Sequence, residues 1–197
     1  PNRPVVGVTW YEALAYCRWL TEQSQATGFL SQVWRDGQFE GVSFRLETLK
    51  VRLPSEAEWE KAARGVDGRR WPWGNPWVAG RANTAEARIE DTSAVGAFPG
   101  GESPYGVMDM AGNVWNWTRS RWGRTSISRP DYCYPYDSTD GREELRGPDL
   151  RVLRGGSRFN LRRLARCAFR GGVVPDVFSS DVGFRVAAVV SLENSGC

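Results

Sequence analysis

Residues 151–187 constrain the fold of this chain more than any other stretch, because short runs rich in glycine and arginine alternate there with runs that share no chemical theme. The enclosing runs are 151–157, 166–168, 175–176 and 183–185. Between them, aromatic, aliphatic, basic and acidic residues follow neither the helix period nor the strand period. A segment without an apolar face cannot form a core element, so we expect irregular loops carried by a scaffold.

The residues between the enclosing runs form a set of sixteen candidate ligand-facing positions. They are Phe159, Asn160, Leu161, Arg162, Arg163, Leu164, Phe169, Gly171, Gly172, Val173, Val174, Val177, Phe178, Ser179, Ser180 and Asp181. If these side chains point outward, the phenylalanines are the expected binding anchors and the charged residues the expected source of polar specificity. The alternative is that Phe159 or Phe178 completes the core.

Length and composition predict one domain over residues 1–197. A chain of 197 residues with 41% hydrophobic content can enclose one sizeable core. Ten tryptophans and 22 glycines fit a loop-rich fold whose aromatic residues anchor irregular segments. No apolar run reaches the eighteen residues of a membrane span. Because residues 1–4 resemble neither an initiator sequence nor a signal peptide, we expect a piece of a longer protein.

Two helices are predicted from their start signals. A capping-box spacing at Thr9 and Glu12 precedes an amphipathic pattern over 10–23, and the same spacing from Ser55 opens a second helix over 56–64. Both helices should pack on one sheet. Short strands are predicted over 114–118, 152–155, 165–170 and 184–190. The last run is nearly continuously apolar and is therefore predicted to be central.

Motifs along nearly the whole chain resemble one known family. They lie at 8–10, 16–20, 52–60, 62–65, 73–75, 82–83, 105–117 and 151–187. In this order they resemble the formylglycine-generating-enzyme-like branch of the C-type lectin fold, the sulfatase-modifying factor type. The resemblance implies an α+β fold with two helices on a small, mostly antiparallel sheet and long irregular loops. The strand that normally opens this domain is missing, and residues 125–148 are expected to form an inserted loop near the variable face, either solvated or adding fixed contacts.

Within that fold, residues 151–187 resemble the variable region of a diversity-generating retroelement variable protein. In such proteins a mutagenic reverse transcriptase replaces template adenines, so asparagine codons become codons for many residue types. All sixteen candidate residues are reachable from an asparagine codon by this route, and Asn160 would be an unchanged one. Lysine, glutamate, glutamine, tryptophan and methionine are unreachable, and none occurs in the set. Arg158 departs from the family, which has tryptophan after Gly-Gly-Ser.

The resemblance implies a non-enzymatic receptor for an unknown protein or cell-surface ligand. A monomer of bacterial, archaeal or phage origin is expected, and the compartment, cytoplasmic or surface-displayed, stays open. The alternative function is a formylglycine-generating-enzyme-like oxidase that has lost its catalytic cysteine pair, or a divergent enzyme of that family.

Known catalytic routes of this family lack their residues in this chain. The oxidases use two cysteines shortly after Gly-Gly-Ser, but residues 158–164 contain no thiol, and Cys167 lies in an enclosing run. The chain has no histidine, so a histidine iron site and a histidine-based nucleophile are both excluded. We therefore assign no catalytic residue. Cys17 and Cys167 are predicted to be buried free thiols, and a disulfide involving any of the four cysteines, which include Cys133 and Cys197, stays open.

The resemblance also implies structural calcium as the one candidate cofactor. Asp109 and Asn116 match positions that hold one ion together with carbonyls near Gly112, and Asn83 matches a ligand of a second site. Calcium requires six to eight oxygens and favours carboxylates. Asn116 stands where the family has glutamate, and residues 86–92 are shorter than in the family, so calcium binding remains an open expectation.

Seven arginines lie within residues 151–170, and such a cluster beside phenylalanines can bind nucleic acid. Framework arginines are instead expected to pair with acidic residues such as Asp176 inside the fold; they are Arg154, Arg166 and Arg185. This pairing leaves Arg158, Arg162 and Arg163 for a ligand. Nucleic acid is therefore not the expected partner.

Overall fold

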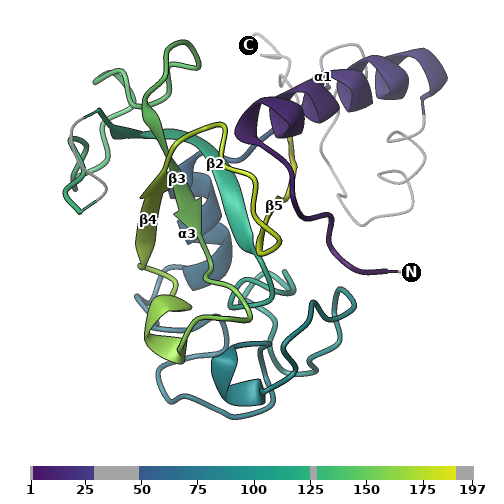
Figure 1. Ribbon diagram of the computed structural model, residues 1–197, viewed down its shortest axis with the longest axis vertical. Helices are drawn as coiled ribbons and strands as arrows, with labels where there is room; N and C mark the ends of the chain where they lie inside the picture. Colours follow the sequence, from purple (N-terminus) through teal and green to yellow (C-terminus); the bar gives the residue numbers. More distant parts are fainter. Residues whose placement is uncertain (1, 29–48, 125–127, 190–197) are drawn as a thin grey trace, which may run out of the picture.

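The computed structural model describes residues 2–28, 49–124 and 128–189 (Figure 1). These residues form α1 (Trp10–Thr27), β1 (Lys50–Arg52), α3 (Glu56–Arg64), η2 (Ala85–Ala87), β2 (Trp115–Gly123), β3 (Leu150–Arg154), η3 (Arg162–Leu164), β4 (Arg170–Val173), β5 (Val182–Phe184) and β6 (Ala187–Val189). The predicted α+β class is confirmed. Across the described ranges, no helix is long and apolar enough to cross a membrane.

A four-stranded sheet with the order β4-β3-β2-β5 forms the centre of the fold. The strands β2, β3 and β4 pair antiparallel, and β5 runs parallel to β2 at the edge. β6 belongs to a separate two-stranded ladder with β1. The prediction of one central strand over 184–190 is therefore wrong: Arg185 and Val186 interrupt it, because the Arg185 guanidinium turns toward carbonyl oxygens of the 108–109 loop. Residue 190 lies outside the described residues.

The strand predicted over 165–170 is also wrong, apart from its last residue. Ala165 and Cys167 are buried while Arg166 is exposed, which gives the alternation of a strand. The backbone instead follows η3 and the turn after it, where the amide of Leu164 donates to Leu161 (2.8 Å). A tight turn can thus imitate the period of a half-buried strand.

Both predicted helices form, and both begin with the predicted capping boxes at Thr9 and Ser55. α3 has the predicted bounds. α1 continues four residues beyond its predicted end, to Thr27, where Gly28 adopts the left-handed conformation (φ 64°) that closes a helix. The sequence pattern ended early because the last turn of α1 exposes most of its side chains.

The two helices pack on the central sheet as predicted. Trp10, Ala13 and Cys17 of α1 are buried with Trp117 and Leu153 of the sheet. On α3, a second cluster forms around Trp59 and Ala63, and this helix contacts β2 and β3. In Figure 1, α3 lies behind the sheet and α1 lies beside its upper end.

A buried ionic network joins α3 to the sheet. The side chain of Arg154 on β3 is completely buried and contacts both Glu56 and Glu60 of α3. Arg170 of β4 also binds Glu56 through two nitrogens, and the Tyr134 hydroxyl donates to Glu60 (2.5 Å). Side chains from β3, from β4 and from the loop that contains Tyr134 thus all contact the two carboxylates of α3.

The inserted loop, described from residue 128 onward, is largely exposed, as a solvated loop would be, and a few of its side chains anchor it. Besides the Tyr134 bond, Tyr136 donates to Glu143 (2.8 Å). The Arg142 guanidinium lies over the rings of Tyr132 and Tyr136, 5.7 and 4.7 Å from their centroids. In Figure 1 this loop lies at the opposite end of the sheet from the loop that contains η3, so the expectation that it adjoins that part of the variable face is wrong.

Removing Arg154 should destabilise the fold strongly, because Glu56 and Glu60 would keep buried carboxylates without this cation. We expect Arg154→Met to lower the free energy of unfolding by about 3–5 kcal/mol. The matched control is Arg69→Met, which breaks the more exposed Arg69–Asp67 pair and should change it far less. Urea denaturation followed by circular dichroism measures both, and equal effects would contradict the assignment.

Candidate functional site

The sixteen candidate positions lie on the loop between β3 and β4, on β4, and on the loop between β4 and β5. The structure exposes seven of them: Phe159, Leu161, Arg162, Arg163, Val174, Phe178 and Ser180. Eight others are half-buried, and Gly172 is buried. Phe159 is 55% exposed and Phe178 is 74% exposed, so neither ring completes the core. Most of the set therefore reaches the surface.

The surrounding framework holds these loops by their main-chain carbonyl groups. Each of the following carbonyls accepts a hydrogen bond from outside the set: Asn160 from the Ala85 amide (3.0 Å), Arg162 from the Trp71 indole (3.3 Å), Phe169 from Arg154 (2.8 Å), Ser179 from the Gly7 amide (3.0 Å), Ser180 from Arg158 (2.9 Å) and Asp181 from the Trp115 amide (2.8 Å). Every residue type has this carbonyl. This part of the support of the loops does not depend on their side chains.

A further main-chain contact joins the η2 turn to the η3 loop. The Glu86 carboxylate accepts the amide of Arg162 at 3.0 and 3.1 Å. With the Ala85–Asn160 bond, this contact places the two turns side by side at the lower end of the molecule (Figure 1). The turn at 85–87 therefore supports the first part of the candidate site.

Several candidate side chains are built into the structure. Asn160 Oδ1 accepts hydrogen bonds from the amide and hydroxyl of Ser157 (2.9 and 3.0 Å), and the Asp181 carboxylate accepts from the hydroxyls of Ser157 and Ser179. Val173 and Val177 pack partly against the core. These positions have structural roles in addition to any contact with a ligand.

Gly172 contradicts the expectation that the whole set is free to change. A β-carbon at this position would lie 2.4 Å from the Trp122 ring, whereas one at Gly171 would lie 3.7 Å from its nearest neighbour, Trp115. The first distance is a clash and the second is ordinary contact. Gly172 is therefore required by packing.

Arg158 is not free for a ligand, contrary to expectation. Its side chain is buried, its guanidinium donates to the carbonyl (2.9 Å) and hydroxyl (3.4 Å) of Ser180, and it lies 4.2 Å from the centroid of the Phe159 ring. The residue thus connects the two loops of the candidate site.

The framework arginines differ in their partners. Arg154 pairs with acidic residues as expected, although with Glu56 and Glu60 and not with Asp176. Arg166 is exposed and donates to the carbonyl of Arg163 (2.8 Å), so the expected internal ion pair is not formed within the described part of the chain. The partners of Arg185 are described below with the calcium positions.

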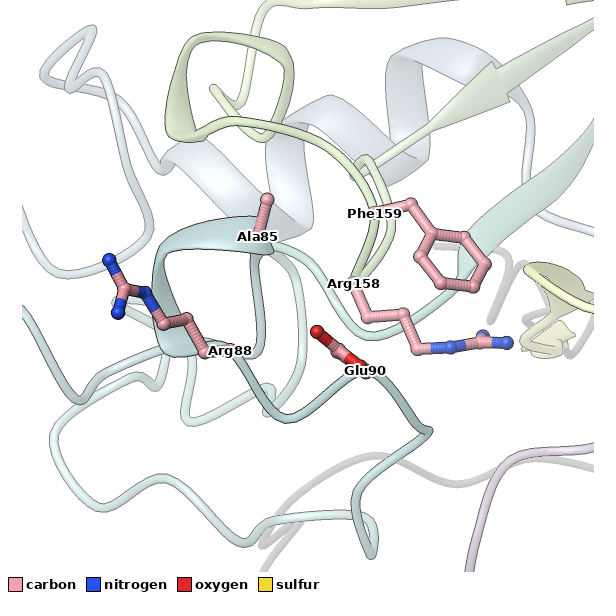
Figure 2. Close-up of a pocket in the computed structure, with 5 residues that line it drawn as sticks. All are labelled: Ala85, Arg88, Glu90, Arg158 and Phe159. Carbon is pink, nitrogen blue, oxygen red and sulfur yellow. The ribbon is translucent and has the colours of Figure 1, made fainter.

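A cavity of about 380 Å³ lies between the turn at 85–90 and the start of the β3–β4 loop. Its lining residues are Ala85, Arg88, Glu90, Arg158 and Phe159 (Figure 2). The sequence does not single out residues 85–90, because a short polar turn without periodicity carries no signal of which surface it will adjoin. Only the fold brings this turn to Phe159.

The described cysteines are free thiols. Cys17 and Cys167 are buried, as predicted, and Cys133 is exposed. Burial raises the pKa of Cys17 to about 11 and that of Cys167 to about 12, so both are protonated thiols near neutral pH. Among residues 2–28, 49–124 and 128–189, no group of three or more histidine, cysteine, aspartate or glutamate residues is placed to hold a metal ion. Cys197 lies outside the described residues.

The positions implied for calcium fit the ion poorly at Asn116. Asn116 Oδ1 already accepts from the Trp59 indole (2.9 Å) and from Arg185 Nε (2.7 Å), and its Nδ2 donates to the Val114 carbonyl (3.1 Å). Arg185 also donates to the Asp109 carbonyl (3.0 Å). Burial lowers the pKa of Arg185 to about 10, which leaves it charged at neutral pH. A guanidinium therefore occupies the place where a second cation would be repelled.

The other two positions implied for calcium, Asp109 and Asn83, differ in whether their side-chain oxygens already accept a hydrogen bond. One Asp109 oxygen accepts the amide of Gly96 (2.8 Å). Asn83 Oδ1 is buried without a hydrogen-bond partner, while its Nδ2 donates to the carbonyl of Asp91 (2.9 Å). Asn83 thus keeps one open oxygen, far fewer than the six to eight that calcium requires.

Comparison with known proteins gives matches over almost the whole chain. Residues 1–190 match the family described as the sulfatase-modifying factor enzyme 1-like domain. The chain is 32% identical to the formylglycine-generating enzyme of Mus musculus, over 95% of this chain and 44% of that protein, and 32% identical to the inactive C-alpha-formylglycine-generating enzyme 2 of Bos taurus, over 94% and 50%. The chain thus spans half or less of the length of these two relatives.

Among solved structures, Treponema denticola variable protein 1 is similar, with a TM-score of 0.65 and 26% identity, over 95% of this chain and 71% of that one. The similar proteins thus include a named enzyme, a protein named inactive, and a variable protein.

Substitution of the two adjacent glycines should separate a packed position from an open one. Gly172→Ala forces a methyl group into the Trp122 ring, so we expect the free energy of unfolding to fall by about 1–3 kcal/mol. Gly171→Ala makes only ordinary contacts and should change it by less than about 0.5 kcal/mol. Chemical denaturation measures the free energy of unfolding of both variants. Equal stability of the two would show that Trp122 can move aside.

Proposed function

Because the chain belongs to the sulfatase-modifying factor enzyme 1-like family, and its fold carries the candidate positions on two loops and on the strand β4 between them, with seven of them exposed, we propose that it is a non-enzymatic binding protein. Its ligand is a protein or another cell-surface macromolecule, bound by a monomer through the exposed candidate positions. A retroelement diversifies these positions, so related copies recognise different ligands.

The observation that carries this proposal is the main-chain support of the loops. Six carbonyl groups within the candidate set are hydrogen-bonded by donors outside it, and the Arg162 amide is bound by Glu86. A surface that must change its side chains without unfolding requires such support. An enzyme of this fold would instead need fixed side chains at these positions.

The exposed side chains supply what a macromolecular interface needs. Phe159 and Phe178 present rings whose burial contributes on the order of 1–2 kcal/mol each, and Leu161 and Val174 extend the apolar surface. Arg162 and Arg163 lie beside them and add charge-assisted hydrogen bonds. Since the loops are ordered before binding, little conformational entropy is lost on association.

An oxidase remains the alternative, because named formylglycine-generating enzymes are among the relatives. Two observations oppose it. Residues 158–164 lack the cysteine pair, and burial keeps the nearby Cys167 protonated, with a pKa of about 12. A soft metal such as copper binds thiolates, and a single buried thiol is a poor substitute for a thiolate pair.

Nucleic acid is a weaker candidate than protein. Arg154, Arg158 and Arg170 are engaged inside the fold and cannot form a continuous basic surface. Acidic Glu86 is exposed and accepts the amide of Arg162, and exposed Glu90 lines the cavity beside Phe159. Mixed charges beside apolar rings fit a protein surface better than a phosphate backbone.

Two displayed libraries test the proposal directly. The first randomises the seven exposed candidate positions, and the matched control randomises seven half-buried or buried ones: Asn160, Leu164, Gly172, Val173, Val177, Ser179 and Asp181. We expect the first library to keep display and protease resistance in most clones and to yield binders against a panel of unrelated proteins. The control library should lose both properties in most clones. If the first library loses them to the same extent, the proposed binding face is wrong.

The retroelement part makes a separate prediction about the genome. A near-copy of the segment that encodes residues 151–187 should lie beside a reverse-transcriptase gene and differ from it only where the copy has adenine. Sequencing of the surrounding locus tests this. A locus without such a copy refutes the diversification mechanism and leaves the binding role to the library experiment. We expect the codon for Gly172 to be constant between related copies.

A further inference from the structure

The cavity in Figure 2 is built almost entirely from positions outside the sixteen candidates. Ala85, Arg88 and Glu90 come from the η2 turn and its continuation, and Arg158 directly follows the enclosing run 151–157 and lies outside the candidate set. Only Phe159 belongs to the candidate set. A ligand that binds the exposed loops therefore meets a wall that stays constant while the neighbouring side chains change.

Two opposite charges on this constant wall have no partner among the residues that the structure describes. Within the described residues, neither Arg88 nor Glu90 makes a side-chain hydrogen bond or an ion pair. Both have left-handed backbone conformations, with φ of 53° and 60°, which are unfavourable for residues other than glycine. Such conformations persist only where the surroundings enforce them, and they cluster at binding sites. The turn thus holds Arg88 and Glu90 in unfavourable backbone conformations, and neither charge is paired within the described residues.

The third charged group of the cavity also has an unused donor. The Arg158 side chain is 7% exposed, and its Nε is buried without a hydrogen-bond acceptor, although the outer nitrogens bind Ser180. In Figure 2 the Glu90 carboxylate lies between the side chains of Arg88 and Arg158, whose guanidinium groups point away from it in opposite directions, and Phe159 lies beside Arg158. The charges therefore alternate along the cavity as positive, negative and positive.

We infer that this cavity is a constant subsite that receives a short peptide segment carrying both a basic and an acidic side chain. The inference rests on the proposed binding function and specifies the partner. The basic side chain of the ligand pairs with Glu90, an acidic one pairs with Arg88, and an apolar stem lies against Ala85 and the Phe159 ring. Ligands of related copies then share this segment and differ at the surface that the exposed loops contact.

The alternation of charge favours a peptide over other macromolecules. Nucleic acids and acidic glycans supply negative groups and hydroxyls, so neither supplies a cation for Glu90. A purely apolar ligand would bury the charges of Arg88 and Glu90 without compensation, which is strongly unfavourable. Protein side chains provide both signs within two or three residues.

A phage-displayed library of random dodecapeptides is the probe for this subsite. It is panned on the immobilised chain, and selected peptides are remeasured on the double variant Arg88→Glu with Glu90→Arg. We expect these peptides to bind the double variant about tenfold or more weakly, and their charge-reversed versions to regain binding to it. The matched control exchanges two exposed charges on α1, Arg18→Glu with Glu22→Arg, and should change nothing. Thermal melts confirm that both variants fold.

The outcomes separate the subsite from the proposed function. Peptides that lose binding with Phe178→Ala but not with the charge exchange overturn the subsite and leave the binding face intact. Charge-reversed peptides that fail to bind the double variant also overturn it, as does panning that enriches no peptide. If a sulfated or carboxylated glycan in a parallel array binds and the charge exchange abolishes that binding, the peptide assignment is wrong. The proposed function itself is overturned only by the display libraries, if the library of exposed positions loses display and protease resistance as the control library does.

Discussion

The contact of Arg154 with Glu56 and Glu60 is the interaction on which the rest of the structure depends. It fixes α3 to β3, and through Glu56 it also fixes Arg170 at the start of β4. The same guanidinium donates to the Phe169 carbonyl, at the end of the first loop. A completely buried cation requires both carboxylates, because desolvation without compensation would exceed the gain from any single pair. One side chain therefore links the core to the surface loops.

The surface loops have a second support that does not pass through the core. The η2 turn, the Trp71 indole, the Gly7 amide and the Trp115 amide each bind a loop carbonyl. These donors come from segments far apart in the sequence, so the loops are ordered by the whole domain. This arrangement explains how side chains without a common theme can follow one another for more than twenty residues in a stable protein. Arg158, inside the fold, adds a side-chain link between the two loops, because its guanidinium donates to the Ser180 carbonyl.

Sequence patterns predicted what depends on local chemistry and missed what depends on distant contacts. The capping boxes at Thr9 and Ser55 are local signals, and both helices begin where those signals place them. The division of 184–190 into two strands depends on where the Arg185 guanidinium finds acceptors, which no local pattern encodes. Similarly, the need for glycine at 172 comes from Trp122 on a different strand. The cavity was beyond sequence reasoning for the same reason, since its two walls meet only in the fold.

The main-chain support of the loops restricts changes in loop length but permits changes in side chains. Because each supported carbonyl must meet a donor fixed elsewhere, inserting or deleting a single residue would shift every later carbonyl away from its donor. Related copies can therefore differ in the side chains of the loops while the loop length stays the same. They cannot lengthen a loop to reach into a deep crevice of a ligand. Their ligands are limited to surfaces whose shape is complementary to the one backbone conformation that these loops share.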